Sequence, residues 1–230
     1  MGRGGGAVSP GYWQEERDDA PPAVADDVID LVFTVRGRTL PADHAWALSE
    51  AIEALLPWFP DEPRAGLHLV HAAASGNGWQ SPEDDDEGVL YLARRTRLVL
   101  RIPRERIDDA RVLEGVTLDV AGHSLEVGTA REHLLSPLTT LYARHVIAPE
   151  GDEEAFLEDA ARELAGLGIE CKRMICGRTR HFRGPRGRVF TRSLMLDGLD
   201  FDASQQLQRS GLGPGRHHGF GLFVPHKAVK

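Results

Sequence analysis

The sequence has few of the features that mark a secreted, disulfide-bonded or membrane-spanning protein. Its 230 residues include two cysteines, Cys171 and Cys176, too few for a disulfide framework. They stand five apart in a strand-like stretch, so their side chains are expected on opposite faces, where they cannot bridge each other. No apolar run approaches the ~20 residues of a membrane span, and the N-terminus lacks a basic-then-apolar signal pattern. We therefore expect a cytoplasmic protein.

The sequence also lacks the spacings of common metal and nucleotide sites. Its ten histidines include no His-x-x-x-His pair, and the cysteines have no metal-ligand spacing. The acidic run Glu83–Glu87 is typical of a solvated loop. A glycine-rich segment near the C-terminus follows a predicted helix and precedes a predicted strand, the reverse of the dinucleotide-binding and P-loop order. We expect no metal and no cofactor.

Charge is unevenly distributed along the chain. The net charge is −8, yet residues 171–230 hold twelve Lys or Arg against three Asp. Eight of these cations fall in one stretch without an acidic residue: Lys172, Arg173, Arg178, Arg180, Arg183, Arg186, Arg188 and Arg192. A local basic segment on an acidic protein predicts contact with phosphates. The alternative is a solvated hairpin without a ligand.

Five glycines lie between Gly211 and Gly221. Glycine permits positive φ and close approach of a ligand to the backbone, and successive exposed amides form an anion-binding concavity. Gly213, Gly215, Arg216 and His217 are therefore predicted to contact the same anion as the basic segment. The alternatives are that they pack across two domains, or form a purely structural turn.

Hydrophobic periodicity predicts two α+β units in tandem. Residues 1–26 are expected to form a disordered extension. The unit at 27–137 is predicted to contain strands at 28–36, 66–72, 89–102, 116–120 and 123–129, with helices at 44–56, capped by Asp43, and from 103 to about 114. The unit at 138–230 is predicted to contain strands at 140–147, 169–178, 189–196 and 222–224, with helices at 152–167 and 202–210, the second capped by Asp202. Each unit has the β-α-β-β-α-β order of a ferredoxin-like fold.

The doubled unit with a glycine loop before its last strand resembles the RAMP superfamily of CRISPR-associated proteins. Within it, the chain resembles the endoribonuclease that cuts CRISPR repeat RNA, and its Myxan-subtype branch most closely. The resemblance covers residues 28–227. It is carried by the segments Leu40–His44 (LPADH), Leu56–Trp58 (LPW), Gly66–His68 (GLH), Arg97–Pro103 (RLVLRIP), Leu141–Arg144 (LYAR) and Leu207–Lys227.

The resemblance implies metal-independent cleavage of precursor crRNA for antiviral defence. The ribose 2′-OH attacks the adjacent phosphate and leaves a 2′,3′-cyclic phosphate and a 5′-OH. The family commonly carries a catalytic histidine at the start of its first helix, where His44 stands; an imidazole can move a proton near neutral pH. His68 is the main alternative and His71 a weaker one.

The chain departs from the family pattern in having no lysine near this histidine, since its lysines are Lys172, Lys227 and Lys230. Arg36, Arg38 or Arg64 is predicted to stabilise the phosphorane instead, although arginine cannot act as a general acid. Tyr91 and Tyr142 are expected to pack. Two alternatives stay open: a non-catalytic RNA-binding RAMP subunit of an effector complex, and a scaffold that binds no RNA.

Overall fold

The computed structural model describes residue 24, residues 26–71 and residues 88–226. Almost all of the predicted N-terminal extension, and the acidic run 83–87, lie outside this range. None of the described helices is long and apolar enough to cross a membrane.

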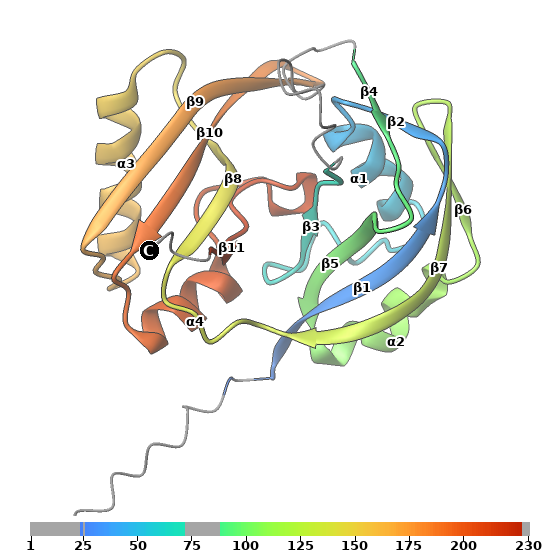
Figure 1. Ribbon diagram of the computed structural model, residues 1–230, viewed down its shortest axis with the longest axis horizontal. Helices are drawn as coiled ribbons and strands as arrows, with labels where there is room; N and C mark the ends of the chain where they lie inside the picture. Colours follow the sequence, from blue (N-terminus) through green and yellow to red (C-terminus); the bar gives the residue numbers. More distant parts are fainter. Residues whose placement is uncertain (1–23, 25, 72–87, 227–230) are drawn as a thin grey trace, which may run out of the picture.

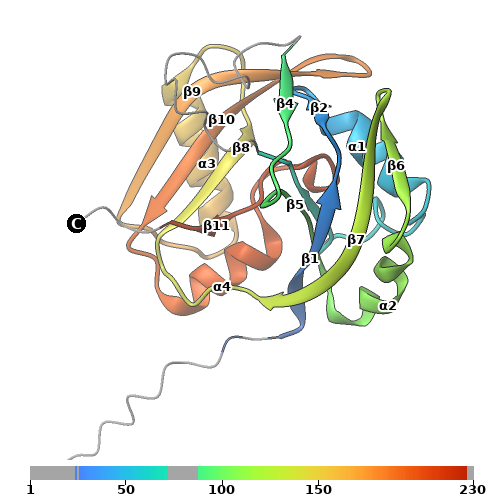
Figure 2. The same cartoon turned by 45° about the vertical axis from the view of Figure 1, so that its right-hand side comes forward.

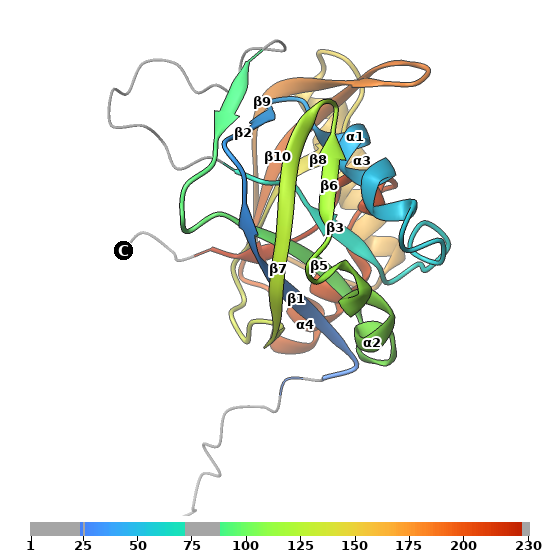
Figure 3. The same cartoon turned by 90° about the vertical axis from the view of Figure 1, so that its right-hand side faces the viewer.

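The N-terminal half forms a five-stranded antiparallel sheet in the order β3-β5-β1-β7-β6. Two short strands, β2 and β4, pair beside it. Leaving aside β6, the order β7-β1-β5-β3 is that of a ferredoxin-like fold. In Figure 3 the helices α1 and α2 lie together on one side of this sheet. The elements are β1 (Val28–Arg36), β2 (Thr39–Pro41), α1 (Ala45–Glu53), β3 (Gly66–His68), β4 (Val89–Tyr91), β5 (Arg97–Pro103), η2 (Arg104–Arg106), α2 (Ile107–Ala110), η3 (Arg111–Leu113), β6 (Thr117–Val120) and β7 (His123–Leu134).

Several predicted boundaries in this half are wrong. The single strand predicted over 89–102 is two strands, because the chain turns where the amide of Ala93 donates to Thr96 Oγ1 at 3.0 Å. Helix α1 ends at Glu53 rather than near Leu56. Asp43 does not cap it: His44 is the N-cap residue, and the Asp43 carboxylate instead accepts the Arg183 amide at 2.7 Å.

The C-terminal half forms a four-stranded antiparallel sheet in the order β11-β8-β10-β9. This is the same ferredoxin-like order, so the predicted α+β class with two such folds in tandem is confirmed. Figure 1 shows α3 along the outer edge of this half and α4 below its sheet. The elements are β8 (Leu141–Ile147), α3 (Glu153–Gly166), β9 (Arg173–Gly184), β10 (Gly187–Asp197), α4 (Phe201–Ser210), η4 (Arg216–His218) and β11 (Val224–Pro225).

Two predictions in this half are also wrong. The strand expected at 169–178 is β9, which starts four residues later and runs to Gly184. The N-cap of α4 is Asp200, whose carboxylate accepts the Ala203 amide at 2.7 Å, and Asp202 lies in the first helical turn. An Asp at N-cap or inside the first turn is favourable in both positions, so composition alone does not separate them.

The two halves, here called the first and second domains, meet over an extensive junction. Each sheet packs its own apolar core, but Phe182 of β9 and Phe220 of the glycine loop belong to the core of the first domain. The C-terminal segment, red in Figures 1 and 2, runs between the two sheets and brings η4 against β3 and α1.

Two buried arginines cross this junction in opposite directions. Arg101 of β5 donates to the carbonyls of Gln208 and Phe223 in the second domain, at 2.9 and 2.7 Å. Arg216 of the glycine loop donates to the carbonyls of Arg64 and Ala65 in the first domain, both at 3.1 Å. Buried carbonyls need such partners, so the exchange holds the domains in one relative position.

Candidate active site between the two domains

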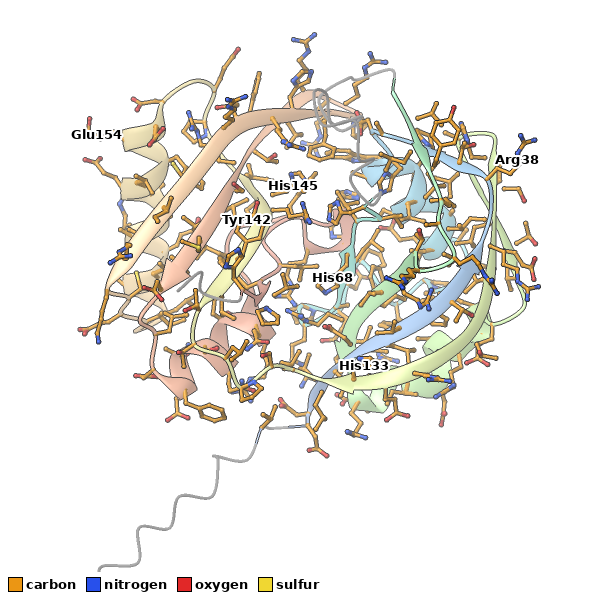
Figure 4. The ribbon with its side chains drawn as sticks, in the orientation of Figure 1. Arg38, His68, His133, Tyr142, His145 and Glu154 are labelled. Atoms are coloured by element: carbon orange, nitrogen blue, oxygen red, sulfur yellow. The ribbon has the colours of Figure 1, made fainter. Side chains whose placement is uncertain are left out.

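Three adjoining hollows lie at or beside the domain junction, and His145 of β8 lines all three. Residues of both domains line the first, which contains His44, and the third, which contains His68. The second is lined by β8, β9 and β10 of the second domain. We call the three hollows together the junction groove. In Figure 4 the labelled His68, Tyr142 and His145 lie in this central region, whereas Arg38 and Glu154 lie at opposite outer edges. The polar and charged side chains that line the groove are Asp43, His44, His68, His71, Tyr142, Arg144, His145, Arg178, Thr179, Arg180, His181 and Ser193.

The three histidines considered from the sequence all line the groove. His44 and His71 share the first hollow, and His71 and His68 share the third. Their convergence has a local cause, because the N-terminus of α1 and the segment after β3 lie side by side: His44 accepts the Val70 amide at its Nε2, at 3.0 Å.

His44 is held firmly in this position. Its side chain is buried, its Nδ1–H donates to the carbonyl of Pro41 at 2.9 Å, and a second carbonyl, Ala42, lies at 3.2 Å. With Nε2 accepting an amide and Nδ1 donating, the ring is in its neutral Nδ1–H form. These hydrogen bonds stabilise the backbone at the N-terminus of α1, and the catalytic role of His44 stays a prediction.

His68 lies beside the Arg101–Asp30 pair, and its side chain is partly buried. Its Nε2 is 3.5 Å from Asp30 Oδ1. Burial lowers the pKa of His68, against the opposing pull of the Asp30 carboxylate. Burial works to raise the pKa of Asp30, but Arg101 and His68 outweigh it and hold that pKa well below its usual range. His68 therefore lies next to a buried ion pair, Arg101–Asp30, whose arginine also bonds across the domain junction.

Among the groove residues that the sequence did not single out, His145 is the one that lines all three hollows. It stands on β8, and its backbone carbonyl accepts the Gly221 amide at 2.7 Å. Its ring packs edge-on against Phe182 at 4.9 Å between centroids, and the His71 ring lies 6.2 Å away. The only sequence signal was its place directly after the family-like segment Leu141–Arg144.

The basic stretch forms the β9–β10 hairpin, and its cations divide into three groups. Arg178 and Arg180 line the groove. Arg192 is buried, donates to the Gly177 carbonyl at 2.9 Å and lies 3.5 Å from Glu153. The remaining cations are exposed on the hairpin surface: Lys172, Arg173, Arg183, Arg186 and Arg188. Seven of the eight predicted RNA-binding cations thus face the groove or solvent, and Arg192 does neither.

The hairpin tip reaches across to the first domain. The Arg183 amide donates to Asp43 beside His44, and Phe182 is buried in the first domain's core. The basic surface and the groove are therefore continuous. By contrast, Arg36 pairs with Glu126 at 3.8 Å and Arg64 with Glu105 at 2.6 Å. The arginines that line the groove are Arg144, Arg178 and Arg180.

The glycine loop packs into the junction. The amides of Leu212, Phe220 and Gly221 bond carbonyls within the loop or on β8. Gly219 has φ of +93°, and a Cβ there would collide with Leu69 of the first domain. Burial lowers the pKa of Arg216 to about 10. Of the roles predicted for Arg216, packing across the domains is the one its geometry supports; RNA contact by Gly213, Gly215 and His217 stays a prediction.

A model of the family described as Cas6 Crispr matches residues 29–228. A protein of Myxococcus xanthus named CRISPR-associated endonuclease Cas6 is 33% identical over 198 residues, which cover 86% of this chain and 81% of that protein. The chain belongs to the Cas6 family. The family resemblance inferred from the sequence is thereby confirmed.

Solved structures show the same fold. One described as CRISPR associated protein Cas6 has a TM-score of 0.59 at 13% identity, covering 87% of this chain and 100% of that one. Another, described as an RAMP protein binding different RNA substrates, has a TM-score of 0.55 at 11% identity, covering 85% and 98%.

Proposed function

We propose that this protein is an endoribonuclease that binds and cleaves CRISPR repeat RNA in precursor crRNA, producing mature crRNAs for antiviral defence. The observation that carries the proposal is membership of the Cas6 family along nearly the whole chain, with a relative named as an endonuclease. The histidine-lined groove beside an arginine hairpin supports it, because RNA cleavage needs proton transfer and positive charge in one place.

The proposed chemistry is metal-independent transesterification. The 2′-oxygen beside the scissile bond loses its proton and attacks phosphorus, the bond from phosphorus to the 5′-oxygen breaks, and that oxygen takes up a proton. The products are a 2′,3′-cyclic phosphate and a 5′-OH. Arg180, which lines the hollow beside His44, is placed to stabilise the dianionic phosphorane, since a guanidinium keeps its charge and binds phosphate oxygens in a fork.

Proton transfer is assigned to His44, with His68 and His71 as alternatives. Both ring nitrogens of His44 bond backbone groups in this structure. For His44 to act, RNA binding must shift the Pro41–Ala42 carbonyls or the Val70 amide. Catalytic hydrogen bonds often take up their working geometry only with substrate bound, so this requirement is compatible with the assignment.

RNA binding is assigned to the exposed hairpin cations and the groove arginines. Duplex RNA offers side chains little sequence information in its deep major groove, so shape and phosphate contacts dominate its recognition. A repeat stem laid along the hairpin would place its flanking strand at the groove, because the hairpin tip contacts Asp43 beside His44.

The test is incubation of the purified chain with the host's own repeat RNA in EDTA, followed by end-group analysis. We expect one cut, a 2′,3′-cyclic phosphate and a 5′-OH. His44→Ala is expected to bind this RNA but to cut it at least 100-fold more slowly, and His68→Ala and His71→Ala are compared in parallel. His133→Ala, which removes an exposed histidine of β7, is the control and should cut normally.

The outcomes separate the alternatives. Binding without cleavage by the wild type would favour a non-catalytic RNA-binding subunit. No retention of RNA at low salt would favour a scaffold that binds none. Cleavage that persists in His44→Ala and fails in His71→Ala or His68→Ala would move the proton transfer to that residue. We further propose a cytoplasmic protein that joins a multi-subunit CRISPR effector complex; this rests on the family resemblance, and co-purification with tagged partner subunits tests it.

A further inference from the structure

Three potential metal ligands meet on the side of the first domain where the glycine loop covers α1. Glu53 is the last residue of α1, and His217 and His218 lie in η4. One carboxylate oxygen and one ring nitrogen from each histidine all lie within 4.8 Å of one another. All three residues are half-buried, so the cluster is sheltered but open to a small ion.

The surrounding contacts keep the cluster together. The Ser49 hydroxyl lies 2.7 Å from Glu53 Oε1 and 2.8 Å from the His217 carbonyl oxygen, and so ties the helix to the loop. The His218 ring packs against Trp46 with a tilt of 33° and 4.7 Å between ring centroids, and the centroids of the two histidine rings are 4.0 Å apart. Nδ1 of His218 is buried without a hydrogen-bond partner among the described residues. An orphaned buried nitrogen is costly, and a bound ion is one way to satisfy such an atom.

We propose that Glu53, His217 and His218 bind one divalent transition-metal ion, with zinc as the best match. Imidazole nitrogen and carboxylate oxygen are zinc donors, at about 2.0–2.2 Å from the metal, and two His plus one Glu leave a fourth tetrahedral position for water. Donors around such an ion are about 3.3 Å apart. To bring the donor atoms from their present spacing to this distance, side-chain rotations must move each atom by about an ångström. The half-buried histidine and glutamate side chains can make such rotations.

The site differs from the proposed cleavage site in position and in role. Glu53 ends the helix that His44 begins, and nine residues at about 1.5 Å each separate them by roughly 13 Å along α1. An ion here would join α1 of the first domain to the glycine loop of the second. It would thus strengthen the domain junction without contacting the groove. The metal site does not depend on the proposed mechanism of RNA cleavage.

The test uses the untagged full-length chain, stripped with EDTA and then freed of it. Zn²⁺ titration by calorimetry should show one ion per chain with a Kd in the low micromolar range or tighter. Co²⁺ should give the visible absorption of a four-coordinate site. Thermal unfolding should shift upward with Zn²⁺, because an ion that binds only the folded state stabilises it.

The variants Glu53→Gln and His217→Gln should each weaken Zn²⁺ binding at least 30-fold and abolish the thermal shift. His218 is left unchanged because its ring also packs on Trp46. His133→Ala is the control for binding at an isolated surface histidine and should bind Zn²⁺ like the wild type. Wild-type protein that takes up no Zn²⁺ below about 100 µM, or variants that bind it as tightly as the control, would overturn the proposal. RNA cleavage in EDTA is a separate readout, so either proposal can fail alone.

Discussion

Arg101 offers the sharpest test of how the two domains are held together. Its side chain is fully buried, and its Nε and Nη2 donate to the two carboxylate oxygens of Asp30 at 2.8 and 2.9 Å. Its Nη1 donates to the carbonyls of Gln208 and Phe223 across the junction. The Arg101→Met substitution keeps most of the volume but removes all four hydrogen bonds.

The expected cost is large because the partners are left behind. Asp30 would keep a mostly buried charge without its bidentate hydrogen-bond donor. The carbonyls of Gln208 and Phe223 would also lose their donor. Removing one member of a buried ion pair costs about 3–5 kcal/mol, a large share of the ~5–15 kcal/mol that holds a typical domain folded. Asp30→Asn should cost a similar amount, and the double variant should cost at least ~2 kcal/mol less than the sum of the two, because the residues act as a unit.

Urea unfolding measures these costs, with two probes that report different parts of the molecule. The chain has four tryptophans, of which Trp46 and Trp58 pack against the core of the first domain. With Trp13 and Trp79 replaced by Phe in every variant, tryptophan fluorescence follows that domain, while far-UV circular dichroism follows both. Arg104→Met is the control: Arg104 is about two-fifths exposed and pairs with Glu132 at 3.3 Å, so its loss should cost under ~1 kcal/mol. The reasoning fails if Arg101→Met costs no more than Arg104→Met, or if the double variant is additive.

Three further predictions follow from the junction and the hairpin. Gly219→Ala should destabilise the fold by ~1–3 kcal/mol, measured by urea unfolding, because φ of +93° and the Leu69 contact both exclude a Cβ; Gly122→Ala, at a positive φ with open space around it, is the comparison and should cost less. Burial, with a smaller effect of His217, lowers the pKa of His218 to about 4, so the unfolded chain binds more protons between pH 6.5 and 4. The full shift would correspond to ~1.8 kcal/mol between pH 7 and pH 5, but His218 is only half-buried and solvent screening reduces the effect. Metal-free protein should therefore lose ~1 kcal/mol of stability as pH falls from 7 to 5, and His218→Phe should lose less; equal losses would contradict this. Replacing the hairpin arginines Arg180, Arg183 and Arg186 together should weaken repeat RNA binding and reduce its salt dependence. Unchanged affinity at two salt concentrations would refute the assignment of RNA binding to the hairpin.

The order of elements was predictable because it rests on local signals. Alternating apolar residues such as Leu31 and Phe33 mark β1, and the apolar face around Phe156 and Leu164 marks α3. The strands predicted at 116–120 and 123–129 leave Ala121–Gly122 between them, and both residues have the positive φ of a tight turn. The Asp43 error arose where a tertiary contact decides between local options, because Asp43 leaves the helix end to bind the Arg183 amide of the other domain.

The site was only partly predictable, for a related reason. The family-like segments Leu40–His44 and Gly66–His68 end on two of the candidate histidines, and His71 follows three residues after the second. His145 carries no local signal, because it becomes a groove residue only when the second domain docks. The burial of charged residues is equally hard to predict. Arg192 and Arg216 were both predicted to contact RNA, with packing across the domains as the alternative for Arg216, and each donates to backbone carbonyls in the interior.

The hairpin explains how an acidic protein could bring RNA to a site in its other domain. The basic strands belong to the second domain, yet Phe182 is buried in the first and Gly184 lies against Trp46 of α1. An RNA phosphate backbone bound along β9 and β10 would reach the hollow lined by His44 and Arg180. Any loosening of the junction would move the bound RNA relative to the histidines. Because a misplacement of about 1 Å can cost ~100-fold in rate, Arg101→Met should slow cleavage even in conditions where the protein stays folded and binds RNA normally. Single-turnover cleavage at saturating protein measures this, and an unchanged rate would mean that the hairpin tip alone fixes the two domains.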